Sequence, residues 1–215
     1  MTVRGEGRPK GYFTTDGERV PGVTTITGRF KESGGLLYWA NQEGLAGRTL
    51  QEAREPATST GHLVHSMVEA KLHGQPLPDV TSLEALSSYR AWLEWWEGSR
   101  LEVVATEVPL VSEQHRFGGT IDTILQDSKE RLCIGDWKTS ASVYADYLTQ
   151  VAAYGILWSE LNERPLEGGF HIVRFSKAHG DLEHRHYSHL DEARELFLLL
   201  RRAYDLDKLV QKRAK

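Results

Sequence analysis

Three strand-like segments that follow one another with only short polar links constrain the fold of this chain more than any other feature. They span about residues 101–111, 117–126 and 131–138, and the second link is Asp127-Ser128-Lys129-Glu130. Links this short join antiparallel neighbours, because a parallel connection needs a crossover of a dozen or more residues. A long helix at about 144–162 and a strand at 170–175 follow. This order predicts an α/β fold with a mixed central sheet rather than a doubly wound parallel one.

The segments on either side predict a hairpin and further helices. Residues 12–25 are expected to form a hairpin, because extended residues flank the turn pair Asp16-Gly17. After Pro56, the polar residues Thr58-Ser59-Thr60 offer N-caps for a helix. The remaining expected elements are helices at about 36–46, 61–73, 82–97 and 191–210 and a strand at 182–187.

Length and organisation predict one domain. The chain has 215 residues, and we find in it no internal repeat, low-complexity tract or linker. We expect a single domain over 1–215 with its core at about 58–175. A hairpin and helix at 1–57 would precede this core, and a strand and helix at 176–215 would follow it.

The composition excludes several classes of protein. With 40% hydrophobic and 26% charged residues, the chain is neither disordered nor a coiled coil. It has no apolar run long enough to cross a bilayer and no apolar segment behind its basic start, so we expect a cytoplasmic protein without a membrane partner. The single cysteine, Cys133, excludes an intramolecular disulfide and a cysteine-held iron–sulfur cluster.

The third strand and its predecessor carry the residues with the clearest chemistry. Strand alternation puts Asp136 and Lys138 on one face and Trp137 on the other. If the two strands pair, Asp122 converges on Asp136, and two close carboxylates repel unless a cation or proton lies between them. Oxygen ligands without cysteine favour Mg²⁺ or Mn²⁺. A plain ion pair between Asp136 and Lys138 at a strand end stays open as the alternative.

Two helices add pairs of polar residues four positions apart. His65 and Glu69 share one face of the expected helix at 61–73, so His65 is either a third metal ligand or part of a surface His–Glu pair. Gln150 and Tyr154 lie early in the helix after the third strand. They either hold a phosphate or a base, or form an exposed polar face.

Taken in order, these motifs resemble those of the PD-(D/E)xK nuclease superfamily. The closest likeness is to its RecB-type branch, which includes phage and mitochondrial genome-maintenance exonucleases. The resemblance covers about residues 12–175, and the superfamily's restriction-endonuclease-like core, α-βββ-α-β, agrees with the predicted order of elements. The motifs are Val20–Ile26, Gly61-His62-Leu63-Val64-His65 with Glu69, Gly119-Thr120-Ile121-Asp122, Asp136-Trp137-Lys138-Thr139, and Gln150 with Tyr154.

The resemblance implies a role for each matching residue. Lys138 would be the general base or an electrostatic partner, and one or two Mg²⁺ or Mn²⁺ ions would be the cofactor, with no iron–sulfur cluster. The implied metal ligands are His65, Asp122, Asp136 and the main-chain carbonyl of Trp137. Substrate contacts are implied for Gln150, Tyr154 and Thr139. Relatives often carry acids where Glu69 and Glu107 stand.

The implied activity is metal-dependent hydrolysis of DNA phosphodiester bonds. The resemblance favours an exonuclease on DNA ends or single strands that serves recombination, repair or replication, with proteins of those assemblies as partners. The alternatives are a structure-specific endonuclease and a catalytically inactive DNA-binding module. Asp122→Ala or Asp136→Ala is expected to abolish cleavage and leave the fold intact, because either change removes one of two repelling acids.

Overall fold

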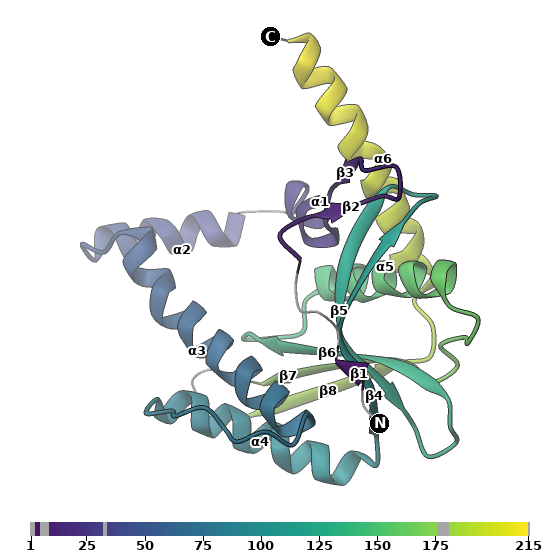
Figure 1. Ribbon diagram of the computed structural model, residues 1–215. Helices are drawn as coiled ribbons and strands as arrows, with labels where there is room; N and C mark the ends of the chain where they lie inside the picture. The colour runs from purple at the N-terminus through teal and green to yellow at the C-terminus, as the bar shows by residue number, and fades with distance from the viewer. Residues whose placement is uncertain (1–2, 5–8, 32–33, 176–180, 215) are drawn as a thin grey trace.

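A six-stranded mixed sheet forms the centre of the protein (Figure 1). The computed structural model describes residues 3–4, 9–31, 34–175 and 181–214. The strands lie in the order β1-β4-β5-β6-β7-β8, with β4, β5 and β6 antiparallel, β6 and β7 parallel, β7 and β8 antiparallel, and β1 parallel to β4. The prediction of a mixed α/β sheet is confirmed. The bounds are β1 (Val3–Arg4), β4 (Glu102–Ser112), β5 (Phe117–Gln126), β6 (Leu132–Thr139), β7 (Gly169–Phe175) and β8 (Leu182–Tyr187).

Helices cover both faces of the sheet and bury two apolar cores. The first core joins the sheet to α1 (Val23–Arg29), α5 (Ala145–Leu161) and α6 (Asp191–Arg213). The second joins it to α3 (Leu50–Leu72) and α4 (Leu83–Ser99). Helix α2 (Gly34–Leu45) lies between α1 and α3 in the chain. No helix within the described ranges has the length and apolar character needed to traverse a lipid bilayer.

Aromatic packing in the second core fixes the orientation of β6. Trp137 is buried, and its ring meets Trp92 and Trp95 of α4 edge to face, each at 5.9 Å between centroids. Such pairs add about 0.5–1.5 kcal/mol to the burial of their area. Because neighbouring strand residues face opposite sides, a Trp137 held against α4 turns Asp136 and Lys138 toward the other face.

The N-terminal hairpin is shorter than the sequence predicts. It consists of β2 (Tyr12–Phe13) and β3 (Arg19–Val20), with Gly17 of the expected turn at φ 82°. The expectation that it extends to residue 25 is wrong, because α1 begins at Val23. The β-branched residues here favour a strand locally, but Val23 and Ile26 become buried on one helix face, so tertiary packing decides.

Helix α3 begins eleven residues before its predicted start, at Leu50 rather than at residue 61. Thr49 caps it in a reciprocal capping box: its hydroxyl accepts a bond from the Glu52 N–H at 3.2 Å, and the Glu52 carboxylate accepts one from the Thr49 N–H at 2.8 Å. The prediction of N-caps at residues 58–60 is therefore wrong, and the helix continues through Pro56. An interior proline costs a helix about 3 kcal/mol, more than the roughly 1 kcal/mol of a cap, so the cap gives the start of the helix and does not by itself explain its passage through Pro56.

Candidate functional site

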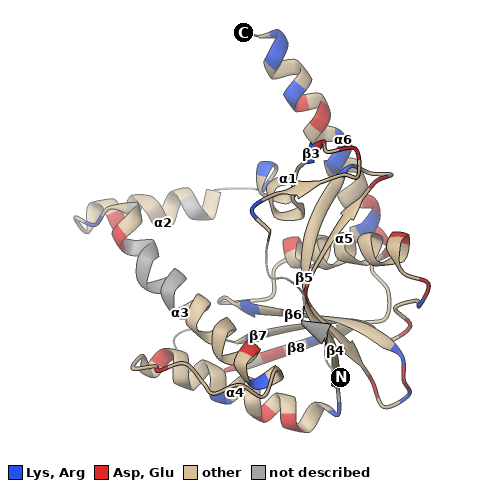
Figure 2. Ribbon diagram, in the orientation of Figure 1, with Lys and Arg blue, Asp and Glu red and all other residues tan. Residues whose placement is uncertain are grey.

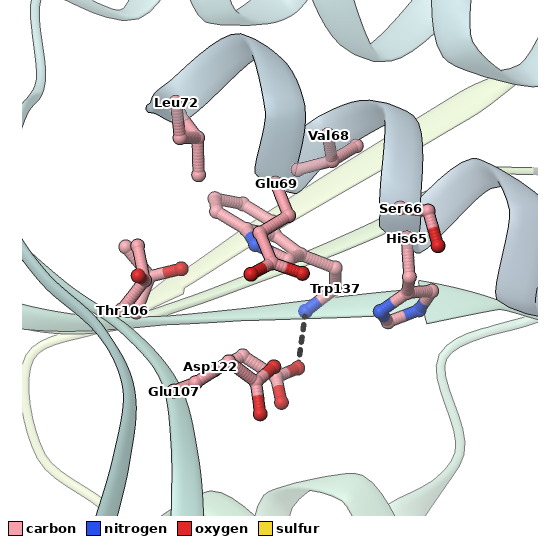
Figure 3. Close-up of a pocket in the computed structure, with 10 residues that line it drawn as sticks. His65, Ser66, Val68, Glu69, Leu72, Thr106, Glu107, Asp122 and Trp137 are labelled. Atoms are coloured by element: carbon pink, nitrogen blue, oxygen red, sulfur yellow. Dashed lines mark hydrogen bonds between the residues drawn. The ribbon is translucent and has the colours of Figure 1, made fainter. Parts of the chain in front are cut away.

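A cavity of about 80 Å³ lies between α3 and strands β4, β5 and β6 (Figure 3). Strands β5 and β6 pair from Gln126–Leu132 to Thr123–Gly135, and beyond this point their pairing ends. Space of this size admits roughly five waters at about 15 Å³ each, or a small hydrated ion. The residues around it are His65, Ser66, Val68, Glu69, Leu72, Thr106, Glu107, Asp122, Thr123 and Trp137.

Asp122 forms part of the wall of this cavity and is held by the neighbouring strand. Its side chain lies just past the last β5–β6 pair, and the residue is 5% exposed. Its Oδ2 accepts a hydrogen bond from the main-chain N–H of Trp137 at 3.3 Å, as Figure 3 shows. Ile121 and Ile124, on either side of it in β5, are fully buried in the first core and fix the position of the strand.

Two glutamates and a histidine reach the same cavity from other elements. His65 and Glu69 lie one turn apart on α3, and in Figure 3 the Glu69 carboxylate points from the helix toward Trp137 and the sheet. Glu107 in β4 lies between residues that pair with Thr123 and Ile121, the two neighbours of Asp122. Its backbone is left-handed, with φ 47°, a conformation that costs about 1–3 kcal/mol in such a residue and concentrates at functional sites.

Asp136 and Lys138 form a buried ion pair beside the cavity rather than on its wall. Lys138 Nζ lies 2.6 Å from Asp136 Oδ2, and Asp136 is 0% exposed. Burial lowers the pKa of Lys138, but the negative charges of Asp136 and Asp122 outweigh it, and the pKa is raised. Lys138 also lies over the ring of Tyr147, 5.1 Å from its centroid. Lys138 is therefore a fixed cation close to Asp122.

Gln150 and Tyr154 bond to each other on α5. The Gln150 amide donates to the Tyr154 hydroxyl at 2.7 Å. The Tyr154 ring packs on β5 at Gly119, where an added Cβ would lie 2.8 Å from Cε1 of that ring. The pair thus supports β5 three residues before Asp122. Thr139 is half-buried at the end of β6.

Sequence reasoning missed two residues of this region. Tyr147 contacts Lys138, and it was detectable because it lies three positions before Gln150 on the same face of α5. Thr106 lines the cavity and is buried, with its hydroxyl 2.7 Å from His73 Nε2. Thr106 and its neighbour Glu107 both line the cavity. No local pattern predicts this, since adjacent residues of a regular strand face opposite sides.

The donors around the cavity suit a hard divalent cation by their chemistry. Three carboxylates, from Glu69, Glu107 and Asp122, and one imidazole, from His65, line one small space. As the side chains stand, the described residues include no group of three or more His, Cys, Asp or Glu side chains that could hold a metal ion. The oxygen and nitrogen donors are therefore of the type that binds a hard divalent cation, and they surround one cavity. To bind an ion together, these side chains would have to turn toward one another.

Two solved structures are similar to parts of this chain. SSO0001 matches over 60% of this chain and 62% of its own, with a TM-score of 0.37 and 20% identity, so this chain spans about three fifths of its length. A protein of Eubacterium rectale that carries the provisional name of an exonuclease matches over 73% of this chain and 68% of its own, with a TM-score of 0.44 and 18% identity. A comparison with curated proteins returns no significant match.

The sequence also matches a family model, described as the PD-(D/E)XK nuclease superfamily, over residues 32–213. This range contains every element that forms the cavity and the Asp136–Lys138 pair. The fold has the mixed sheet and flanking helices expected of that superfamily. The chain therefore belongs to the PD-(D/E)XK nuclease superfamily.

Proposed function

We propose that this protein is a metal-dependent DNA nuclease of the RecB-type branch that acts as an exonuclease on DNA ends or single strands. The observation that carries the proposal is the acid-lined cavity at Asp122 beside the buried Asp136–Lys138 pair, in a member of a nuclease superfamily. The bonded Gln150 and Tyr154 support the branch, because the likeness to it includes this pair. Recombination, repair or replication of DNA is the setting that suits such an activity, with the proteins of those assemblies as partners.

One or two Mg²⁺ or Mn²⁺ ions would be held by side chains around the cavity. Asp122 and His65 would be the principal ligands, with Glu69, Glu107 and the Trp137 carbonyl beside them. Asp136 would join them on release from its ion pair with Lys138. When bound, such an ion polarises a phosphate and lowers the pKa of its bound water from about 15.7 toward neutrality.

The remaining groups would position and stabilise the substrate. Without an ion, Asp136 and Tyr147 both hold the ammonium of Lys138, and Tyr147 would still contact it when Asp136 turns to the ion. The positive charge of Lys138 would offset the negative charge that develops on the phosphate during attack by water. The ion pair favours this electrostatic role for Lys138 over that of general base. Gln150 and Tyr154 would keep β5, and with it Asp122, at the substrate.

Digestion of end-labelled single- and double-stranded DNA with Mg²⁺, Mn²⁺ or a chelator tests the proposal. We expect cleavage with either ion, none with chelator or with Asp122→Asn, and no cut in a closed circular substrate. Cutting of the circle would support the alternative of a structure-specific endonuclease. DNA binding without cleavage under any metal condition would support the alternative of an inactive binding module, and absence of both would refute the proposal.

A further inference from the structure

A second hollow, of about 360 Å³, lies outside the cavity at Asp122. It is formed by the N-terminal hairpin, the segment that enters α1, and one face of α6. We call it the basic hollow, because three cationic side chains from segments far apart in the sequence line it: Lys10, Arg19 and Lys208. Figure 2 shows Lys and Arg segments beside β3 and along α6, at this end of the molecule.

The charge of the basic hollow is not neutralised within the part of the chain that the structure describes. Its lining includes no described carboxylate, and its three cations form no ion pair with one. Nearby cations behave differently: Arg29 pairs with Asp207 at 2.9 Å and Arg116 with Asp16 at 3.0 Å. In a chain of net charge −4, three uncompensated cations around one hollow form a local anion-attracting site.

The other groups around the basic hollow suit phosphate oxygens. The exposed residues Thr24 and Thr25 bring hydroxyl groups to it, and Lys208 lies over the Tyr204 ring at 5.0 Å from the centroid. Arg side chains bind phosphate through parallel N–H donors, and Lys binds it as a point charge. Hydroxyls and cations of this kind make most of the contacts that proteins form with DNA phosphates.

A continuous structural path joins the basic hollow to the cavity. Tyr12, in the wall of the hollow, packs on β5 at Gly118, where an added Cβ would overlap the Tyr12 ring. Its hydroxyl is 3.0 Å from the Thr120 hydroxyl. Gly118 precedes Asp122 by four strand residues, about 13 Å at 3.3 Å per residue. A stacked strand with about 3.4 Å per nucleotide covers that distance with roughly four nucleotides.

We propose that the basic hollow is a phosphate-binding subsite for the DNA strand beyond the nucleotide that is cut. This inference rests on the proposed nuclease function and adds a second point of contact, at the hairpin and α6. A strand with its scissile phosphate at Asp122 places later phosphates against Lys10, Arg19 and Lys208. Because these contacts touch only phosphate, they raise affinity without reading the base sequence.

The test compares DNA binding by the wild type and by the triple variant Lys10→Gln, Arg19→Gln, Lys208→Gln. Anisotropy of labelled single strands is measured in chelator, so that no DNA is cut, over a range of salt concentrations. We expect at least a tenfold weaker affinity at low salt for a long strand, and a salt slope reduced by about 2, from roughly 0.7 per lost phosphate contact. A strand of two nucleotides, too short to span both places, should bind the wild type far more weakly than the long strand does.

A matched control removes three exposed cations outside the basic hollow: Arg90→Gln in α4, Arg100→Gln at its C-terminal end and Lys129→Gln in the β5–β6 turn. Both triple variants have the same net charge, and thermal melting checks that each is folded. Equal affinities and salt slopes for the wild type and the hollow variant would overturn the subsite but leave nuclease function intact. Equal losses in both variants would also overturn it, because they would show a general charge effect. A wild type that neither binds nor cuts DNA would refute the proposed function itself.

Discussion

Replacement of Asp136 by Asn is expected to destabilise the fold by about 3 kcal/mol. The Asp136 carboxylate is 0% exposed, and Lys138 Nζ lies 2.6 Å from its Oδ2. Asn preserves the shape but not the charge, so an ammonium group whose side chain is only 14% exposed loses its nearest negative partner. Breaking a buried ion pair from one side costs about 3–5 kcal/mol. The lower value is expected, because Asp122 also raises the pKa of Lys138 and remains in place.

A double-mutant cycle with Lys138→Met measures this interaction. Urea unfolding at pH 7, followed by tryptophan fluorescence, gives the free energy of unfolding for the wild type, Asp136→Asn, Lys138→Met and the double variant. We expect both single variants to be destabilised and the double variant to lose less than the sum of the two, because it removes both members of the pair; part of the cost remains, because the buried Asp122 loses the nearby charge of Lys138. A cost below 1 kcal/mol for Asp136→Asn, with no coupling between the two sites, would refute the reasoning.

Three further changes test other parts of the account. Burial, together with the neighbouring His186 and His184, lowers the pKa of His171 to about 4. Between pH 6.5 and pH 4 the unfolded chain therefore binds a proton that the folded chain does not, so the free energy of unfolding should fall by up to about 3 kcal/mol as the pH is lowered. In urea titrations at several pH values, His171→Gln should reduce this loss of stability at acid pH. Gly119→Ala should lower the free energy of unfolding by about 1–3 kcal/mol, because the added Cβ overlaps the Tyr154 ring. Gly28→Ala, with nothing within 4 Å of its Cβ, should not lower the thermal unfolding temperature. Tyr154→Phe removes the acceptor of the Gln150 amide and should cost about 1 kcal/mol in the same unfolding assay.

The strands were predictable because their signals are local. The expected and observed ranges of β5 and β8 coincide: a mostly apolar run followed by a polar turn marks β5, and β8 carries apolar residues at its two ends, Leu182 and Tyr187. Helix starts were less predictable, because they depend on competition between signals. Pro56 indicated a boundary, but the capping box at Thr49 begins α3 earlier. At Val23 the local preference for a strand is overridden by packing against the first core.

The candidate site was only partly predictable, because its geometry is non-local. His65 and Glu69 were identified from their spacing, but their approach to Asp122 depends on how α3 lies over the sheet. The left-handed backbone at Glu107 breaks the alternation from which the sequence argument starts. The two aspartates look equivalent in the sequence, yet Asp122 lines the cavity and Asp136 is paired with Lys138. The expectation that Asp136→Ala leaves the fold intact is therefore replaced by a predicted loss of stability.

Binding of Mn²⁺ to the wild type and to Asp122→Asn, measured by isothermal titration calorimetry, tests the central claim most directly. Asn still accepts the Trp137 N–H bond, so the variant should remain folded. Asp79→Asn, an exposed change outside the cavity, is the control. Loss even of an outer partner of a metal ligand costs about 10–100-fold in affinity, so Asp122→Asn should bind Mn²⁺ at least tenfold more weakly than the wild type and the control. Equal binding by all three proteins, or no binding by the wild type, would contradict a metal site at this cavity.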